Sequence, residues 1–305
     1  MKFSSIFNLR KWVLLYLGRT KGEKLSDELF LKLKFYACIG KKLNLDNPRT
    51  FNEKLQWLKL YNRKPEYTMM VDKYLVRDYV KEKLGEEYLI PLIGVWDSPE
   101  DIDFDALPEK FVLKCNHNSG RGMYICKDKS KMDIQKVKDG LRSGLEQDYF
   151  LQSREWPYKN VNRKIIAEQF MEDEKTSELR DYKFFVFDGI VRALFIATDR
   201  QTPGVETKFD FFDENFNHLP IINEHPNAPI MPEKPEQFEE MKRLASLLGQ
   251  GMPHVRIDFY EVNGKIYFGE ITFFQNSGLV PIEPDEWDEK LGSWIVLPKK
   301  RCENN

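Results

Sequence analysis

Two apolar segments late in the chain, residues 255–260 and 267–273, carry charged side chains between hydrophobic ones and constrain the fold more than any other feature. Both are rich in the β-branched and aromatic residues that favour strands. Alternate residues of a strand share a face, so Arg256 and Asp258 are expected on one side of the first strand. Glu270 lies among apolar neighbours in the second. A carboxylate on a buried strand face is costly unless it is paired or binds a metal ion, so this hairpin is a candidate site.

The turn between these strands provides a geometric test. Asn263-Gly264 is typical of a two-residue hairpin turn. Such a turn pairs residues whose numbers sum to 527, which puts Asp258 and Glu270 on opposite faces. A three-residue loop or a bulge makes the sum even and puts them on the same face. If the two carboxylates share a metal ion, the hairpin must therefore have a three-residue loop or a bulge. The alternative is a surface hairpin with scattered polar residues and no metal site.

A second candidate feature is a short strand, 111–115, that leads into the polar loop 116–122. The residue order is not that of a Walker A loop. A lysine at position 114 suits phosphate oxygens as a point charge, and backbone N–H groups of a glycine-containing loop can bind the rest. The lysine and the loop residues of interest are Lys114, Asn118, Ser119, Gly120 and Gly122. The alternative is an ordinary edge-strand lysine.

A third candidate feature is the apolar strand 165–171, which runs out to an acidic segment. Its main chain could hold an adenine ring. Lys183 projects among apolar neighbours in the following segment, 181–189. The alternative is a pair of ordinary sheet strands with one lysine that extends its amine to solvent.

Composition is that of an ordinary globular protein. The chain has 305 residues, enough for two domains or for one domain of several lobes, and a net charge of −2. No overall basic field would draw it to nucleic acid. Its cysteines lack C-x-x-C and zinc-ligand spacing, so reduced thiols in a cytoplasmic protein are expected. They are Cys38, Cys115, Cys126 and Cys302.

The first 24 residues are basic, with six Lys or Arg against one Glu and a net charge of +5. Apolar residues recur there at near-helical spacing; they are Phe3, Ile6, Phe7, Val13, Leu14 and Leu17. One interpretation is a helix lying on the anionic inner membrane surface, and the other is a helix packed on its own protein with a solvated basic face. The apolar run 12–17 is too short to span a membrane and lacks the cleavage site of a signal peptide.

The predicted elements follow a simple order along the chain: helices come first, a mixed region follows, and antiparallel hairpins come last. This order favours an α+β fold over a doubly wound parallel sheet. Helices are predicted over 25–36, 50–60, 72–84, 130–149 and 235–248. Strands are predicted over 88–95, 111–115, 123–126, 165–170, 182–187, 192–197, 255–261 and 266–273. Thr50 and Glu53 form a capping-box pattern, and Gly85 is placed as a helix C-cap. The segment 203–235 is expected to be a long irregular loop.

Five blocks, in this order, resemble the TupA-like family of the ATP-grasp superfamily, which belongs to cell-surface polysaccharide biosynthesis. The blocks are Asp72-Lys73-Tyr74, 89–92, 113–117, 181–185 and 268–273. The resemblance extends from about Asn52 to Leu297. It implies an ATP-grasp fold, in which two antiparallel-rich α+β lobes sandwich the nucleotide after a helical N-terminal region. The expected division is 1–65 for that region and 66–300 for the lobes, split into 66–160 with the phosphate loop and 161–300 with the metal site.

The resemblance also implies roles for individual residues. Lys73, Lys114 and Lys183 would contact the nucleotide. The adenine would be held by the segment Glu168, Gln169, Phe170 and Met171. Asp258 and Glu270 would hold Mg²⁺, and Arg256 would steady an acyl-phosphate, with Lys183 as its catalytic partner. The family often has Asn two residues after the metal-binding Glu, but this chain has Thr272; Asn276 is the candidate replacement.

The implied activity is an ATP- and Mg²⁺-dependent carboxylate–amine ligase that acts on a bacterial cell-surface or capsular polysaccharide or its precursor. Its partners would be a carboxylate-bearing sugar or glycan and an amine donor. Alternatives are a kinase, a metal-dependent glycosyltransferase suggested by Asp103-Phe104-Asp105, and a non-catalytic ATP-binding assembly protein. Candidates to line the acceptor site are Arg154, Glu155, Trp156, Tyr158, Arg200 and the 203–235 loop.

Overall fold

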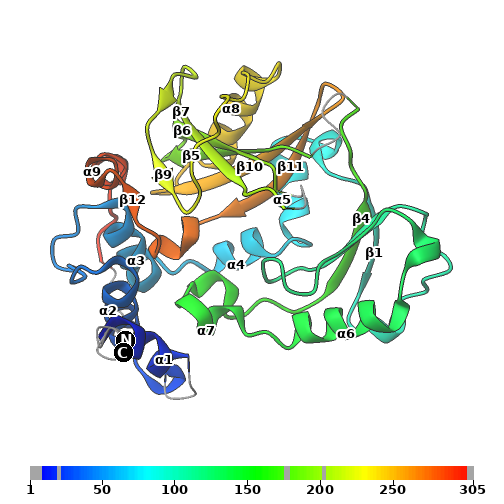
Figure 1. Ribbon diagram of the computed structural model, residues 1–305, viewed down its shortest axis with the longest axis horizontal. Helices are drawn as coiled ribbons and strands as arrows, with labels where there is room; N and C mark the ends of the chain where they lie inside the picture. The colour runs from blue at the N-terminus through cyan, green and yellow to red at the C-terminus, as the bar shows by residue number, and fades with distance from the viewer. Residues whose placement is uncertain (1–8, 19–21, 175–178, 201–203, 301–305) are drawn as a thin grey trace, which may run out of the picture.

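Antiparallel pairing organises the chain into two main sheets and one small one (Figure 1). The structure is a computed structural model that describes residues 9–18, 22–174, 179–200 and 204–300. The first sheet has the order β1 (Leu92–Trp96), β4 (Ile165–Gln169), β2 (Phe111–Cys115), β3 (Tyr124–Cys126). The second has the order β11 (Lys265–Thr272), β10 (Val255–Val262), β5 (Asp181–Phe187), β6 (Ile190–Thr198), β7 (Lys208–Asp213), β8 (His218–Leu219). β12 (Ile282–Glu283) pairs with β9 (Ile222–Asn223).

Helices cover these sheets from separate parts of the chain. They are α1 (Leu9–Leu17), α2 (Asp27–Ile39), α3 (Phe51–Tyr61), α4 (Pro65–Val71), α5 (Val76–Lys83), α6 (Ile134–Leu145), α7 (Tyr149–Ser153), α8 (Phe238–Leu248) and α9 (Asp285–Trp294). In Figure 1 the first sheet lies with α6 on the right, and the second sheet lies above and to the left with α8. The predicted α+β class with antiparallel sheets is confirmed.

Each main sheet has its own hydrophobic core. The smaller core packs β2 and β4 against α6 and includes Phe111, Leu141 and Ile165. The larger core packs the second sheet against α8 and also takes in residues of α2, α3, α4, α5 and α9. β4 pairs with β1 and β2, so the first lobe's sheet extends past the boundary expected at residue 160.

The β10–β11 hairpin answers the geometric question raised by its sequence. Asn263 and Gly264 both have positive φ, as a two-residue turn of this kind requires. The pairs next to the turn sum to 527, as in Phe259↔Phe268, but the register then shifts, so that Asp258 faces Glu270. Gly269 is the extra residue of this bulge. The prediction that a shared face requires an odd loop or a bulge is confirmed, and the device is the bulge.

α3 begins with the predicted capping box, in which Thr50 accepts from the Glu53 N–H and the Glu53 side chain accepts from the Thr50 N–H. One face of this helix is polar yet buried. Asn52, Gln56 and Lys59, spaced at i, i+4 and i+7, are 2%, 0% and 0% exposed. α3 packs against α9 and the turn η7 (Gln275–Gly278), so this face is turned toward distant parts of the chain.

Several predicted elements have different limits in the structure. The helix predicted over 72–84 starts only at Val76, because the Asp72 carboxylate accepts from the backbone N–H groups of Tyr74 and Leu75 and holds a turn there. The strand predicted over 88–95 starts after Pro91, which has no N–H to donate.

Two longer predictions were wrong. The helix predicted over 130–149 is broken into α6 and α7, because the Asp148 side chain caps a new helix by accepting from the Leu151 N–H. The segment 203–235 is not a simple loop, since it contains β7, β8 and β9. The strand formers of β7 pair with β6 despite the surrounding prolines.

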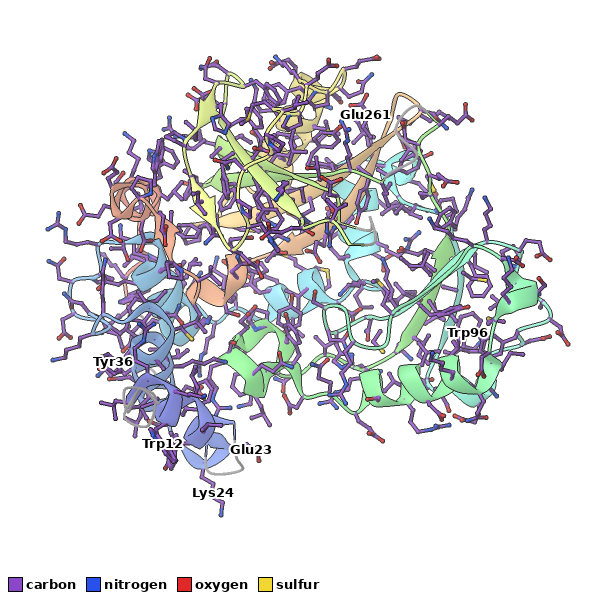
Figure 2. The ribbon with its side chains drawn as sticks, in the orientation of Figure 1. Trp12, Glu23, Lys24, Tyr36, Trp96 and Glu261 are labelled. Carbon is purple, nitrogen blue, oxygen red and sulfur yellow. The ribbon has the colours of Figure 1, made fainter. Side chains whose placement is uncertain are left out.

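The N-terminal helix α1 has no buried residue, and its Trp12 is 59% exposed. Figure 2 shows Trp12 at the outer end of the molecule, near Lys24. Arg10 ties α1 to α2 by donating to the carbonyls of Ala37 and Cys38. None of the helices in the described part of the chain combines the length and apolarity that a bilayer crossing requires. The apolar residues Phe3, Ile6 and Phe7 and three of the six basic residues counted in the first 24 lie outside the described residues, as does Cys302. Those basic residues are Lys2, Arg19 and Lys21.

Candidate active site

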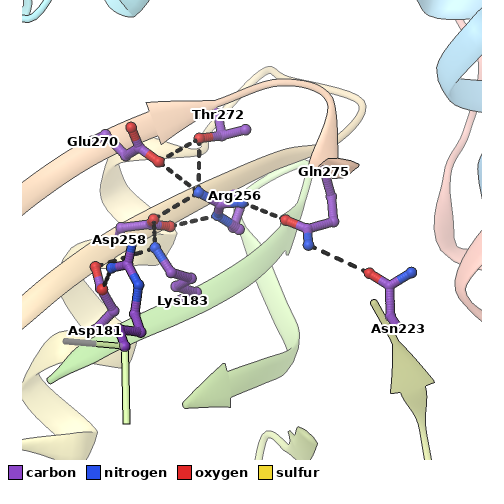
Figure 3. A network of polar contacts seen from close by, with 9 residues as sticks. Asp181, Lys183, Asn223, Arg256, Asp258, Glu270, Thr272 and Gln275 are labelled. Carbon is purple, nitrogen blue, oxygen red and sulfur yellow. Dashed lines mark hydrogen bonds and ion pairs between the residues drawn. The ribbon is translucent and has the colours of Figure 1, made fainter. Parts of the chain in front are cut away.

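Three neighbouring strands of the second sheet present polar side chains on one face. The register pairs Asp258 of β10 with Lys183 of β5 on one side and with Glu270 of β11 on the other. Arg256 pairs with Thr272 in the same way. Because alternate residues share a face, all five side chains meet on one face of the sheet, over the edge strand β11 and its neighbours β10 and β5, as Figure 3 shows.

Arg256 is the centre of this network. Its Nε and Nη2 donate to the two Asp258 oxygens at 2.6 and 2.7 Å, and Nη2 also donates to Glu270 Oε1 at 2.6 Å. It further reaches Thr272 Oγ1 at 3.0 Å and the Gln275 side-chain oxygen. Burial alone would lower the pKa of Arg256, but Asp258 and Glu270 outweigh it and raise that pKa. The guanidinium therefore stays charged between two carboxylates.

Lys183 is also buried and lies between carboxylates. Its amine contacts Asp258 and lies 3.1 Å from Asp181 Oδ1, and Asp181 is itself paired with Arg200. Burial lowers the pKa of Lys183, and the nearby Asp258 opposes that shift. The sequence pointed to Lys183 but not to Asp181, although Asp181-x-Lys183 has the alternation that places both on one face.

The two candidate metal ligands differ in how accessible they are. Asp258 is fully buried and both of its oxygens are bound by cations. Glu270 has a side chain that is 37% exposed. Burial would raise the pKa of Glu270, but Arg256, Lys183 and Lys73 outweigh it and hold that pKa well below its usual range. Glu270 is therefore ionised and open to an incoming cation.

The donor set fits Mg²⁺ only in part. The described residues contain no group of three or more His, Cys, Asp or Glu side chains placed to hold a metal ion. Two facing carboxylates suit Mg²⁺, which commonly takes one or two from the protein and completes its shell with phosphates and water. Asn276, the third candidate ligand, donates its side-chain amide to Asn223 at 3.1 Å. It is Gln275, one residue earlier, that reaches Arg256.

The first sheet carries a second cluster of cations. Lys114 Nζ lies 2.6 Å from Glu168 Oε2, and Arg77 lies 3.5 Å from the other oxygen of the same carboxylate. Lys73 donates to the Asn118 carbonyl at 2.6 Å. Burial lowers the pKa of Lys73, and the carboxylate of Glu270 is the largest influence opposing it. Lys73 thus lies in the electrostatic range of both clusters.

The loop after β2 is anchored at one end and open at the other. Asn118 is buried and donates to the Gly144 carbonyl and to Gln147. Ser119 and Gly120 are exposed. Gly120 and Gly122 both have positive φ, and a Cβ at Gly122 would fall 2.9 Å from the Gly144 backbone. Glycine is therefore required at position 122, while Gly120 has open space beside it.

The predicted adenine segment leaves the first sheet at its end. The pairing of β4 with β2 ends at Gln169, whose N–H donates to the Pro91 carbonyl. The Glu168 side chain is taken up by Lys114 and Arg77. Phe170 and Met171 follow, with Lys110 and Lys127 over the Phe170 ring. The main chain beyond Gln169 is thus free of strand pairing to β2.

A family model described as TupA-like ATPgrasp matches residues 53–296, most of the chain. The chain belongs to this ATP-grasp family. Membership supports ATP-dependent ligase chemistry at a general level. A comparison with curated proteins finds no match.

Solved structures similar to this TupA-like protein include a D-alanine–D-alanine ligase from Helicobacter pylori (14% identity, TM-score 0.47, covering 83% of this chain and 68% of that one). Another is the D-alanine–D-alanine ligase from Bacillus anthracis complexed with ATP (14%, 0.40, 67% and 54%). A third is the ATP-grasp ligase PsnB complexed with minimal precursor, Mg and ADP (11%, 0.39, 72% and 57%). The TupA-like chain spans about half the length of the Bacillus anthracis ligase.

Cations and carboxylates alternate around both clusters. The cations are Lys73, Arg77, Lys114, Lys183, Arg200 and Arg256, and the carboxylates are Glu168, Asp181, Asp258 and Glu270. Asp72, next to Lys73, adds a further buried carboxylate. The lysines and arginines among them are side chains that suit the oxygens of an anionic ligand.

The residues predicted to line the acceptor site have different surroundings in the structure. Arg154 is 2% exposed, pairs with Asp27 and lies over the Phe30 ring, so the expectation that it faces an acceptor is corrected. Arg200 pairs with Asp181. Glu155 is buried and accepts from the Ser277 hydroxyl. Gln275, Asn223 and Arg77 were missed because they reach the site from segments with no motif of their own.

Proposed function

We propose that this protein is an ATP- and Mg²⁺-dependent carboxylate–amine ligase that works through an acyl-phosphate. The observation that carries the proposal is the pair of charged clusters, which are close enough that charges of both act on Lys73. One, with Lys73 and Lys114, belongs to the first lobe, and the other, with Arg256, Asp258 and Glu270, belongs to the second sheet. A polyphosphate placed between them would be neutralised from both sides.

Each residue has a proposed part in holding the nucleotide. Lys73, Lys114 and Lys183 would neutralise phosphate oxygens, and the loop containing Asn118, Ser119, Gly120 and Gly122 would cover them with backbone N–H groups. The segment from Glu168 through Gln169 and Phe170 to Met171 would hold the adenine by its main chain. These assignments follow the family resemblance and the placement of the residues described above.

Glu270 and Asp258 would hold Mg²⁺ together with the phosphates. The ion would supply charge neutralisation for phosphoryl transfer. The cations that now bind Asp258 would exchange that carboxylate for phosphate oxygens, since Arg256 and Lys183 suit either partner. Arg256 would then face the acyl-phosphate, with Lys183 beside it.

The proposed reaction has two steps. A substrate carboxylate oxygen attacks the γ-phosphorus of ATP, and ADP leaves. The nitrogen of an amine then attacks the acyl carbon of the acyl-phosphate, inorganic phosphate leaves, and the ammonium proton is lost to solvent. Negative charge grows on the transferred phosphoryl group and then on the acyl oxygen, and Arg256 is the group placed to stabilise it.

The polysaccharide substrate is proposed from the family resemblance, and the membrane contact from the N-terminal sequence. We propose a carboxylate-bearing sugar of a bacterial cell-surface polysaccharide as acceptor, and a cytoplasmic protein whose helix α1 contacts the anionic inner membrane surface. The exposed Trp12 and the basic N-terminal sequence support that contact. The division into residues 1–65, 66–160 and 161–300 also stays a proposal, with the difference that β4, after residue 160, belongs to the first sheet.

Calorimetric titration with ATP and Mg²⁺ tests the proposal. Lys114→Met and Glu270→Gln each remove one charge from a different cluster, and each is expected to weaken nucleotide binding by about 10- to 100-fold, as for a charge-assisted contact. Lys265→Met, which removes an exposed lysine from the same hairpin, is the control and should bind like wild type.

A folded wild-type protein that binds no ATP would exclude an active ligase and favour the glycosyltransferase. Tight binding without turnover would favour an assembly protein, and phosphorylation of a hydroxyl would favour the kinase.

A further inference from the structure

The segment proposed to hold the adenine, residues 168–171, is attached to a different lobe at each end. At its first end, the Gln169 N–H donates to the carbonyl of the residue before β1 at 3.0 Å. The amines of Lys110 and Lys127 lie over the Phe170 ring, 5.6 and 5.5 Å from its centroid. These partners all belong to the first lobe. The chain then crosses to the second sheet and is attached there within a few residues.

The second attachment is a pair of hydrogen bonds to the turn of the β10–β11 hairpin. The Asp173 carboxylate accepts from the Asn263 backbone N–H at 2.9 Å, and the Asn263 side-chain oxygen accepts from the Glu174 N–H at 3.0 Å. Asp173 is 7% exposed, and a carboxylate so buried needs donors of this kind. Figure 1 shows the chain that leaves β4 running to the tip of this hairpin. We call these two hydrogen bonds the Asp173–Asn263 clamp.

The clamp leaves the chain little length in which to cross between the lobes. Gln169 and Asp173 are four residues apart, so their Cα atoms lie at most about 14 Å from each other. Residues 170–172 make the crossing. The main chain that would meet the adenine is therefore held from both sides, by the first sheet and by the hairpin of the second.

The same hairpin carries the two carboxylates proposed to hold Mg²⁺. Its strands are paired from Val262 and Lys265, next to the turn, to Asp258 and Glu270 beyond the bulge. Five residues of strand lead from Asn263 back to Asp258, a length of about 17 Å at the rise of a β-strand. Backbone pairing ties the turn to these carboxylates, so the clamp fixes the adenine segment relative to the metal site.

We propose that Asp173 and Asn263 are positioning residues for the nucleotide base. The clamp sets the distance between the adenine segment and the carboxylates of Asp258 and Glu270, so that one nucleotide can reach both at once. The inference rests on the proposed function and deepens it, because it gives two residues remote from the phosphates a part in nucleotide binding. Closing the turn requires only a residue that accepts positive φ, for which glycine would serve as well. The side-chain oxygen of Asn263 is used for the clamp.

Calorimetric titrations of the full chain with ATP and with tripolyphosphate, both with Mg²⁺, test the clamp. Tripolyphosphate has the phosphates without the nucleoside, so its affinity depends on the charged clusters and not on the adenine segment. Asn263→Gly keeps a turn residue that accepts positive φ but removes the side-chain acceptor. It should weaken ATP binding about three- to tenfold, as for one lost hydrogen bond, while tripolyphosphate binding stays as in wild type.

Asp188→Gly is the matched control. Asp188 and Gly189 form a two-residue turn between β5 and β6, both with positive φ, and the Asp188 carboxylate accepts from the Gly251 N–H at 3.1 Å. This turn lies at the opposite end of β5 and β10 from the clamp. The control thus loses one hydrogen bond of the same kind and should bind ATP like wild type.

Asp173→Ala removes the other half of the clamp and should show the same selective loss of ATP binding. Unchanged ATP binding in Asn263→Gly would overturn the inference, and so would an equal loss for ATP and tripolyphosphate, because the defect would then lie in the hairpin and not in the hold on the base. The same selective loss in Asp188→Gly would also overturn it. A wild-type protein that binds neither ligand would instead reject the proposed function.

Discussion

At the scale of single residues, the site is built from charges that neutralise one another before any ligand binds. Arg256 is held by Asp258 and Glu270, and Lys183 by Asp258 and Asp181. Buried ion pairs give little net stability, but removing one partner leaves the other unpaired. The network therefore keeps cations in place for a ligand and makes the fold sensitive to each member.

Asp258→Asn should destabilise the protein by about 3 kcal/mol, because it leaves Arg256 and Lys183 buried beside a neutral amide. Urea unfolding at pH 7 measures the change. Asp139→Asn removes a carboxylate that pairs with Arg142 on the surface, where both side chains are about half exposed, and should cost less than about 1 kcal/mol. Similar losses in both variants would contradict this account of the network.

Two buried histidines should make stability depend on pH. Burial lowers the pKa of His254 to about 3 and that of His117 to about 4. The unfolded chain takes up these protons near pH 6.5 but the folded chain does not, so stability is complete above that pH and falls as the pH drops toward 4. Each histidine should cost about 2 kcal/mol between pH 7 and 5.

Substitution separates the two histidines. His254 packs among Phe51, Phe185 and Phe187, so His254→Phe should fold and remove about half of the pH dependence. Urea unfolding at pH 7 and pH 5 provides the measurement. His218→Gln, at an exposed position, should leave the dependence as in wild type. If His254→Phe leaves the slope unchanged, His254 is not the titrating group.

At the scale of elements, local patterns predicted most strands and the capping box of α3, because alternation and caps depend on neighbouring residues. From the sequence, a bulge in the β10–β11 hairpin could be named only as one way for Asp258 and Glu270 to share a face. A single glycine, Gly269, does not by itself reveal a register shift. β7 was hidden by the prolines around it. The sequence also could not place Gln275 or Glu155, whose contacts depend on tertiary packing. Gln275 contacts Arg256 across 19 residues, and Glu155 contacts Ser277 across 122.

Helix α1 should bind anionic vesicles if its exposed face meets the membrane. Trp12→Glu places a negative charge on that face and should reduce cosedimentation with phosphatidylserine-containing vesicles about tenfold or more. Wild-type binding should also weaken at high salt. Tyr36→Glu, on the neighbouring helix α2, is the control and should retain binding. Equal binding to neutral and anionic vesicles would contradict an electrostatic contact.

At the scale of the whole molecule, two hydrophobic cores flank the charged region. One core belongs to the first sheet and α6, and the other to the second sheet with α2, α3, α4, α5, α8 and α9. A nucleotide that contacts Lys114 in one lobe and Glu270 in the other would link the two cores. Its binding should therefore stabilise both.

ATP with Mg²⁺ at about 100 times its dissociation constant should add about 2.7 kcal/mol of stability and raise the melting temperature by about 5 °C. Differential scanning calorimetry should show that the whole unfolding transition, and not a part of it, moves to higher temperature. Lys114→Met should lose most of it at the same ligand concentration. A shift confined to one of two separate transitions would place the nucleotide on a single lobe.

The buried polar face of α3 also has a consequence for how the protein is synthesised. Asn52 contacts Asp288 across 236 residues, and Gln56 and Lys59 contact the Ser277 turn across more than 200. During translation α3 leaves the ribosome more than 200 residues before these partners. The side-chain amides of Asn52 and Gln56 and the amine of Lys59 must stay hydrated until these partners have been synthesised. Until that point the turn η7 also lacks the contacts that hold its left-handed backbone. The strands can pair as they emerge, while the candidate active site is completed only after β11 and η7 have been synthesised.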